Sequence, residues 1–178
     1  MAFHHLAFAT RDIDATHGFY TEAMGFELVR AEVGKTPEGG WAKHLFYAIG
    51  DGECIAFWDL HDDSVPEFSA AISTGLGLPI WVNHVAFKAA DLGELERCKK
   101  RWLQSGNAVS EVDHGWCRSI YALDPNHILV EWCTSTREFD EEDRRGAAEL
   151  LRDPNPPVQE PRPVLVTYPD GRTEEHGG

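Results

Sequence analysis

The sequence predicts an α+β fold built from two tandem copies of a strand–helix–strand–strand–strand (βαβββ) module. Two observations lead to this prediction. The run His-Leu-Ala-Phe at residues 5–8, followed by Asp12, returns 79 residues later as His-Val-Ala-Phe at residues 84–87, followed by Asp91. After each copy, apolar residues recur at helical spacing and then in three strand-like runs separated by turn residues. A period of this length is too long for a solenoid unit and fits a duplicated module.

Each helix is expected to begin at an aspartate and to end at a glycine. Asp12 and Asp91 are good N-cap residues because a side-chain oxygen accepts a free helix N–H group. Glu94 follows Asp91 by three residues, which is typical of a capping box. Gly25 and Gly106 are suitable C-caps. The strands predicted to follow are residues 26–33, 41–48 and 53–60 in the first copy and 107–112, 117–123 and 127–134 in the second.

The two modules are expected to share a cleft. A four-stranded sheet with one helix has one covered face and one bare face, so the bare faces should pack on each other or roll into a common cleft. The predicted organisation is a first module at residues 1–60, a linker at 61–80, a second module at 81–134, and an acidic helix and Pro-rich tail at 135–178.

The C-terminal tail differs in character from the modules. Residues 139–151 predict one acidic helix with Asp140 as its N-cap. Prolines between residues 154 and 163 then interrupt regular structure, and residues 174–178 are expected to fray. The tail is interpreted either as a lid or dimer-clasping arm or as a solvated segment.

Composition excludes several classes of function. The 178 residues include 16 basic and 30 acidic side chains, a formal net charge of −14, which disfavours nucleic acids and anionic membranes as partners. No apolar run approaches the roughly 20 residues of a spanning helix, and the N-terminus lacks the features of a secretory signal. The four cysteines are widely separated, which predicts a reducing, cytoplasmic compartment rather than a disulfide framework.

The two histidines of the repeat are expected to face the cleft. Side chains alternate across a strand, so His5 shares a face with small alanines while Leu6 and Phe8 point to the helix side. His84 should lie in the same way in the second copy. The alternative is that each histidine is a hydrogen-bonded core residue.

A carboxylate in the second copy completes a candidate metal site. Glu131 lies between Val130 and Trp132, where burial of an unpaired carboxylate is costly and a divalent cation would offset the cost. Counting from the preceding turn, its counterpart in the first copy is Phe57. Two histidines and one carboxylate leave coordination positions open for a substrate. The alternative for Glu131 is a surface carboxylate on an edge strand.

These motifs resemble the vicinal oxygen chelate superfamily, which includes glyoxalase I, fosfomycin and bleomycin resistance proteins, methylmalonyl-CoA epimerase and extradiol dioxygenases. The resemblance rests on the tandem His-x-Ala-Phe-x-x-x-Asp and on Asp-Pro-Asn-x-x-x-x-Glu at residues 124–131, and it covers residues 4–134. It implies paired βαβββ modules with a divalent metal bound by His5, His84 and Glu131. Iron(II) is the expected metal, with manganese(II) or zinc(II) as alternatives.

Departures from the family pattern favour the extradiol dioxygenase-like branch. Phe57 stands where glyoxalase I has a glutamate and the epimerase a glutamine, which disfavours those two activities, and an intact metal triad disfavours a bleomycin resistance protein. Tyr121 precedes Glu131 by ten positions, as the active-site tyrosine of ring-cleaving dioxygenases precedes its glutamate ligand. His114, seven rather than nine positions before Tyr121, is the second candidate catalytic residue.

One catalytic position does not match. Extradiol enzymes carry a histidine where this chain has Glu53, so either Glu53 or His44 is the candidate base. The aromatic residues expected to line the cleft are Phe46, Phe57, Trp58, Trp81 and Trp116.

The resulting hypothesis is a metal-dependent, dioxygenase-like oxidoreductase that acts on a small bidentate aromatic substrate of the catechol or hydroquinone type. Alternatives are a metal-dependent lyase, an isomerase or a fosfomycin-type transferase, and a non-catalytic small-molecule binding protein. The resemblance also implies a homodimer. A structural protein without ligand or activity is the remaining possibility.

Overall fold

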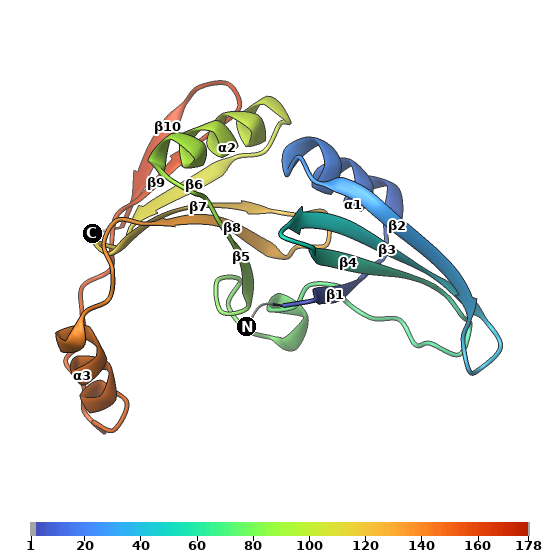
Figure 1. Cartoon of the computed structure of the whole chain (residues 1–178), viewed down its shortest axis with the longest axis horizontal. Coiled ribbons are helices and arrows are strands. Elements are labelled where there is room, and N and C mark those ends of the chain that lie inside the picture. The colour runs from blue at the N-terminus through green and yellow to red at the C-terminus, as the bar shows by residue number, and fades with distance from the viewer. Residues whose placement is uncertain (1–2, 178) are drawn as a thin grey trace.

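The computed structural model describes residues 3–177 and contains two β-sheets, each with one helix packed against it (Figure 1). The first module comprises β1 (His5–Thr10), α1 (Ile13–Gly18), a π-helical turn (Phe19–Ala23), β2 (Glu27–Lys35), β3 (Trp41–Gly50) and β4 (Glu53–His61). The second comprises β5 (His84–Lys88), α2 (Leu92–Gln104), β6 (Val109–Asp113), β7 (Cys117–Leu123) and β8 (Leu129–Ser135). The two predicted βαβββ modules are therefore confirmed.

The linker and tail complete the chain. A short 3-10 turn (Thr74–Leu76) lies in the linker, and the tail forms α3 (Glu141–Leu150), β9 (Val164–Thr167) and β10 (Thr173–His176). The first sheet has the strand order β1-β4-β3-β2, and the second has the order β10-β9-β6-β7-β8-β5. In both sheets the first strand of the module is the edge strand and pairs in parallel with the last strand of that module.

Both module helices begin at the predicted aspartates. Asp12 accepts a hydrogen bond from the N–H group three residues on at 2.9 Å, and Asp91 does so at 2.8 Å. The capping box at α2 is incomplete, because the Glu94 carboxylate accepts from the N–H group of Ala90 rather than from that of Asp91. The negative charge still lies at the helix N-terminus, where it interacts favourably with the helix dipole.

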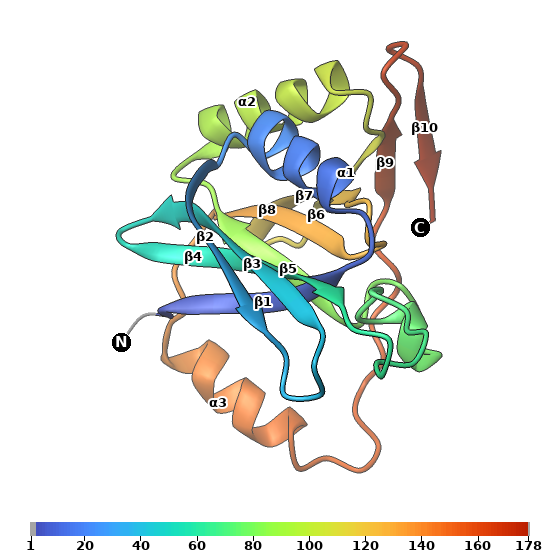
Figure 2. The same ribbon diagram turned by 90° about the vertical axis from the view of Figure 1, so that its right-hand side faces the viewer.

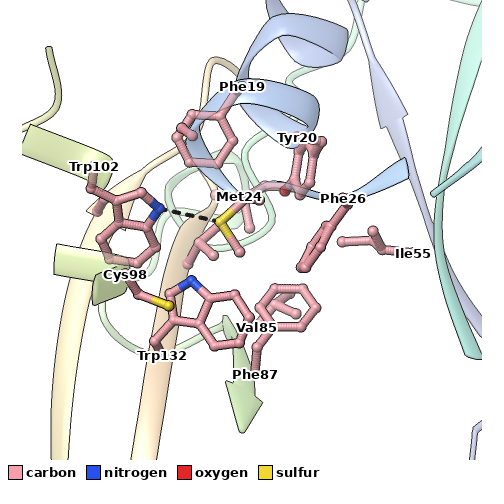
Figure 3. Packing of buried hydrophobic residues seen from close by; sticks show 14 of the residues in the cluster. Phe19, Tyr20, Met24, Phe26, Ile55, Val85, Phe87, Cys98, Trp102 and Trp132 are labelled. Atoms are coloured by element: carbon pink, nitrogen blue, oxygen red, sulfur yellow. Dashed lines mark hydrogen bonds between the residues drawn. The ribbon is translucent and has the colours of Figure 1, made fainter. Parts of the chain in front are cut away.

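The modules associate through their helix sides, not through their bare faces. Figures 1 and 2 show α1 and α2 on the same side of the two sheets. The expectation that the bare faces pack on each other within one chain is therefore wrong. One continuous core joins the modules instead (Figure 3): Trp102 Nε1 donates to Met24 Sδ at 3.3 Å, and the rings of Phe26 and Phe87 are 5.1 Å apart. Burying these large side chains on the helix side leaves both bare faces without a helix or a second sheet packed over them.

Two buried polar contacts also join the modules. The Tyr20 hydroxyl donates to Asp124 Oδ2 at 3.2 Å, and Asn126 Nδ2 donates to Thr16 Oγ1 at 3.1 Å. Burial raises the pKa of Asp124, although its carboxylate accepts several hydrogen bonds. The Asp-Pro-Asn turn therefore has a structural role at the junction of the modules.

The tail extends the second sheet. β9 pairs with β6, and β10 pairs with β9, so the expectation that residues 174–178 fray is wrong for the described residues 174–176. Val164 and Val166 belong to an alternating run that suits a strand, and Gly171, with φ +85°, supplies the hairpin turn. Helix α3 has the predicted cap at Asp140 and lies apart from both sheets with no buried residue (Figure 2).

Two further observations concern the cysteines and the length of the helices. All four cysteines lie within the described residues, and all are free thiols. Among residues 3–177, no helix combines the length and apolar character needed to cross a bilayer.

Candidate metal and catalytic site

The bare faces of the two sheets carry the predicted site residues. His5 and Ala7 are exposed on β1, while Leu6 and Phe8 pack against the core, as the alternation predicts. On β5, His84 is exposed while the next residue, Val85, is buried. The side chains of both repeat histidines therefore lie on the faces that the module helices leave bare.

In the second module, His84 and Glu131 form a close pair. His84 Nε2 lies 3.2 Å from Glu131 Oε2, and the glutamate is only 6% exposed. The other ring nitrogen of His84, Nδ1, is 3.1 Å from the carbonyl oxygen of Trp81 and must donate to it, since a carbonyl only accepts. A neutral His84 would then direct an unprotonated nitrogen at a carboxylate. A proton or a metal cation between these two atoms relieves that repulsion, so the donor set fits a divalent metal.

Tyr121 lies directly opposite Glu131 on the neighbouring antiparallel strand. Burial, with a smaller contribution from the charge of Glu131, raises the pKa of Tyr121 to about 12. The phenol therefore stays protonated at neutral pH. Its oxygen is 2.9 Å from Nε2 of His114, so the two predicted catalytic residues form a hydrogen-bonded pair. A hollow of about 420 Å³ adjoins Tyr121.

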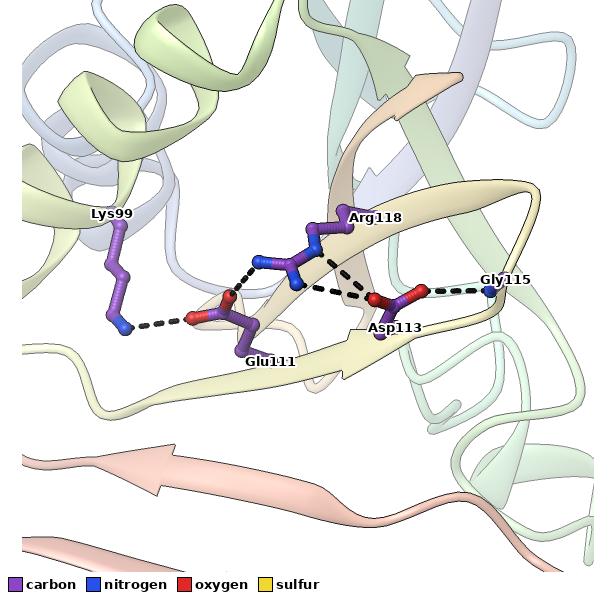
Figure 4. A network of polar contacts seen from close by, with 5 residues as sticks. All are labelled: Lys99, Glu111, Asp113, Gly115 and Arg118. Atoms are coloured by element: carbon purple, nitrogen blue, oxygen red, sulfur yellow. Dashed lines mark hydrogen bonds and ion pairs between the residues drawn. The ribbon is translucent and has the colours of Figure 1, made fainter. Parts of the chain in front are cut away.

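A network of ion pairs and hydrogen bonds fixes the turn that carries His114 (Figure 4). Arg118 donates from Nε and Nη2 to Asp113, each at 3.2 Å, and the other Asp113 oxygen accepts from the Gly115 N–H group at 2.8 Å. Lys99 on α2 binds Glu111 at 2.8 Å. The tail adds one contact, because Arg162 donates to the Asp113 carbonyl at 3.2 Å. The position of His114 is thus set by α2, the β6–β7 turn and the tail together.

His5 lies on the first sheet, away from this pair. Its Nδ1 is 2.7 Å from Nδ1 of His4, and its ring is 5.4 Å from that of Phe46. Within residues 3–177, no three His, Cys, Asp or Glu side chains are grouped so as to hold a metal ion. One chain therefore brings together His84 and Glu131 but does not bring His5 to them.

The register corrects the predicted counterpart of Glu131. Glu131 is the strand partner of Ala86, two residues after His84, and the equivalent partner of Ala7 is Ala56. Phe57 instead points into the core and is fully buried. Counting from the turns failed because the β3–β4 connection and the β7–β8 connection differ in length. The bare face of the first sheet therefore offers alanine, which has no ligand atom, at the fourth symmetric position.

The structure also separates the two candidate bases. Cys54 is the strand partner of His5, so Glu53 points to the opposite face of the sheet. His44 lies on the same face as His5, with 6.0 Å between the ring centroids. Burial, reinforced by the nearby charge of His5, lowers the pKa of His44. Of the two, only His44 is placed to act beside His5.

Comparisons with known proteins agree with this architecture. The Glyoxalase/Bleomycin resistance protein/Dioxygenase superfamily profile matches residues 2–132. The chain belongs to this superfamily. A search of curated proteins found no significant match to the sequence.

Solved structures show the glyoxalase-type fold. Lactoylglutathione lyase from Agrobacterium tumefaciens is 24% identical, with a TM-score of 0.52 over 75% of this chain and 92% of its own. A glyoxylase/bleomycin resistance protein/dioxygenase domain from Frankia sp. EAN1pec is 17% identical, with a TM-score of 0.58 over 76% of this chain and 98% of its own. FosX, a fosfomycin resistance protein from Listeria monocytogenes, is 20% identical, with a TM-score of 0.50 over 81% and 98%. These likenesses establish the fold and leave the reaction open.

Three side chains on the same sheet face as the site were not predicted from the sequence to belong to it. Ser119 and Cys133 are strand partners on the face of Tyr121 and Glu131, next to Cys117, whose pKa burial raises to about 11. Two-residue alternation from Glu131 and Tyr121 would have identified all three. Among the expected lining residues, Phe46 and Trp58 lie on the bare face of the first sheet, whereas Phe57 does not.

Proposed function

We propose that this protein is a metal-dependent, dioxygenase-like enzyme acting on a small bidentate aromatic substrate of the catechol or hydroquinone type. The observation that supports the proposal most is the continuous series Glu131, Tyr121 and His114 next to His84 on one sheet face. A metal-ligand pair with an adjoining phenol and imidazole is suited to hold a chelating substrate and to exchange protons with it. Four free thiols fit a reducing compartment such as the cytoplasm.

The proposed metal site is completed in a homodimer. His84 and Glu131 would supply two ligands from one chain, and His5 of the partner subunit would supply the third. No helix and no second sheet covers the bare faces in the single chain, and helix α3 has no buried residue, so surface is available for such a dimer. Two imidazoles and one carboxylate suit iron(II), manganese(II) or zinc(II).

The bound metal would supply Lewis acidity that lowers the pKa of a chelated substrate hydroxyl. The protein groups around it have separate roles. Tyr121, protonated at neutral pH, donates to or accepts from a substrate oxygen, depending on which way its proton points. The tautomer of His114 sets this direction. When His114 Nε2 accepts the hydrogen bond from the Tyr121 hydroxyl, the phenol oxygen can only accept from a substrate hydroxyl. When Nε2 donates, the Tyr121 hydroxyl is available to donate to the substrate.

The test is oxygen consumption by protein purified without air and loaded with iron(II), measured against catechols and hydroquinones. Turnover should require Glu131, so Glu131→Gln should abolish it, whereas His176→Gln, in β10, should leave it unchanged. Absence of oxygen uptake across the panel by iron-loaded protein would overturn the proposal. Anaerobic conversion of a substrate would instead support the lyase, isomerase or transferase alternatives.

A second candidate is small-molecule binding without catalysis. The absence of a three-ligand group within the described part of one chain favours this candidate over the enzymatic ones if the protein is monomeric. It predicts that chelator-treated protein binds its ligand as tightly as metal-loaded protein does.

A further inference from the structure

Strand β2 forms a long, open edge of the first sheet. Its nine residues, from Glu27 to Lys35, are all exposed, and Figure 1 shows it as the outermost strand of that sheet. It pairs with β3 on one side, and no other strand of residues 3–177 pairs with its outer side. A row of backbone N–H and C=O groups on that side is therefore available to a further strand.

The usual barriers to edge pairing are weak in β2. Natural edge strands prevent pairing with prolines, β-bulges or charged side chains. β2 contains no proline, and its bulge lies near one end, between Leu28 and Arg30. The residues from Arg30 to Lys35 pair with β3 in unbroken register. Over this part only the charged side chains could exclude a partner, so their arrangement decides which strand can pair.

The charges of β2 balance, unlike those of the whole chain. Glu27 and Glu32 are acidic and Arg30 and Lys35 are basic, so the strand has no net charge, whereas the chain carries −14. Arg30 and Glu32 lie on one face of the strand and form an exposed ion pair at 2.6 Å. Two copies of an acidic chain repel each other, and a neutral strand is a place where they can approach.

The order of these charges matches a second copy of β2 in one arrangement. When two β2 strands pair antiparallel with Ala31 at the centre, Arg30 of each copy lies opposite Glu32 of the other. Opposite charges on directly opposed residues stabilise a strand pair, and like charges destabilise it. A parallel pairing in register would align Arg30 with Arg30 and Glu32 with Glu32. The charge pattern thus selects the antiparallel arrangement.

Apolar side chains fit the same arrangement. Val33 of each copy would lie opposite the bulge of the other, beside Leu28 and Val29. In the single chain these three side chains are 69%, 36% and 51% exposed, respectively. Pairing would remove part of this apolar surface from water, which favours association.

We propose that β2 pairs with β2 of a second copy of the chain across a two-fold axis at Ala31. The four-stranded first sheets of the two copies then form one continuous sheet. The contact is isologous, so each favourable pair occurs twice. This inference does not rest on the proposed metal site, because it uses the edge of the sheet and not the bare faces.

The first test exchanges the charges beside the axis. Arg30→Glu and Glu32→Arg each place like charges opposite each other, twice per pair, so each variant should self-associate about tenfold more weakly in analytical ultracentrifugation. An equal mixture of the two variants should regain wild-type association, because the introduced glutamate of one chain then lies opposite the introduced arginine of the other.

Mixing distinguishes contact between chains from an effect within one chain. Both variants lose the ion pair between residues 30 and 32 of the same chain, and mixing cannot restore that pair. Recovery in the mixture therefore reports pairing between copies. A mixture that associates as weakly as the separate variants, or wild-type association that neither variant changes, would overturn the proposal.

The chain offers a matched control at the edge of the second sheet. Arg172 forms an exposed ion pair with Glu174, two residues on, next to and within the edge strand β10. Arg172→Glu changes the net charge by the same amount as Arg30→Glu and should leave self-association unchanged. An equal weakening by Arg172→Glu would show that net charge controls association and would overturn the proposal.

The second test measures the register. Directly opposed residues of an antiparallel pair have Cα atoms about 4.5–5.5 Å apart, a separation that a disulfide can span. Ala31→Cys should therefore form a covalent dimer on mild oxidation, seen in non-reducing electrophoresis. Lys35→Cys, on the same face but four residues from the axis, should give no more covalent dimer than wild-type protein with its four native thiols. Equal cross-linking by the two variants would overturn the assigned axis.

These outcomes are independent of the proposed function. Association that depends on Arg30 and Glu32, in protein without oxygen uptake, supports the β2 contact and counts against the dioxygenase proposal. Oxygen uptake by protein whose association neither charge variant changes does the reverse.

Discussion

Nε2 of His114 lies 2.9 Å from the hydroxyl oxygen of Tyr121, and Tyr121 is the strand partner of Glu131. The two residues are seven positions apart, and the β6–β7 turn brings them together. Because burial raises the pKa of Tyr121 to about 12, the pair holds its phenol proton at neutral pH. A ligand that exchanges a hydrogen bond with Tyr121 on this face therefore acts on His114 as well.

Removing the Tyr121 hydroxyl should slow turnover without loss of metal. Tyr121→Phe keeps the ring but removes the proton donor, so kcat for oxygen uptake should fall on the order of 100-fold. Metal content should be unchanged, because Tyr121 is not among the predicted ligands. Steady-state oxygen consumption and elemental analysis check both parts. A wild-type kcat in Tyr121→Phe would contradict the assigned role.

The hydrogen bond between Tyr20 and Asp124 should stabilise the junction of the modules. Tyr20→Phe removes a buried donor to a carboxylate and should lower the free energy of unfolding by about 1–2 kcal/mol in urea. The control is Tyr168→Phe, whose hydroxyl bonds to Glu174 in the surface hairpin and should change stability by less than about 0.5 kcal/mol. Equal losses of stability in the two variants would show that the Tyr20 hydrogen bond does not stabilise the junction of the modules more than a surface hydrogen bond does.

Asp124 should make stability depend on pH. Its folded-state pKa is raised by burial, so the folded protein holds this proton at pH values where the unfolded chain has released it. Relative to Asp124→Asn, wild-type stability should therefore be highest below the unfolded pKa and fall as pH rises through the folded value. Urea unfolding of both proteins from acidic to neutral pH measures the difference. A difference that is constant, or that grows in favour of wild type with pH, would contradict this linkage.

The C-terminal hairpin should contribute to the stability of the second sheet. Removing residues 163–178 exposes the edge of β6 and removes the buried side chain of Thr167, so the truncated protein should unfold at lower urea concentration. Deleting residues 141–150 tests the converse, because α3 has no buried residue and its loss should leave the urea midpoint nearly unchanged. The measurement is the urea midpoint of each deletion variant, and it should be lower without residues 163–178 than without residues 141–150.

The local elements could be predicted from the sequence because their signals are local. Asp12 and Asp91 act as N-caps, and alternation placed His5 and His84 on the bare faces. The β9–β10 hairpin was missed because its short apolar run follows a Pro-rich segment, and the prolines were given more weight than the alternation. The position of Ala56 depends on strand register, which a count from unequal turns does not provide.

The site could be predicted only in part, for a topological reason. Residues on neighbouring strands, such as Tyr121 and Glu131, are brought together by one turn, so their pairing follows from the sequence pattern. The position of His5 relative to Glu131 depends on how two sheets are arranged. That arrangement is set by packing of Met24, Phe26 and Trp102 on the helix side, which no spacing in the sequence specifies.

The most direct test of the account is metal binding by a mixed dimer of His5→Ala and Glu131→Ala chains, co-expressed with different tags and purified together. If each metal site combines His5 of one chain with His84 and Glu131 of the other, the mixed dimer keeps one intact site and should bind about half the wild-type amount of metal, while each variant alone binds none. A mixed dimer without metal would contradict a site shared between chains.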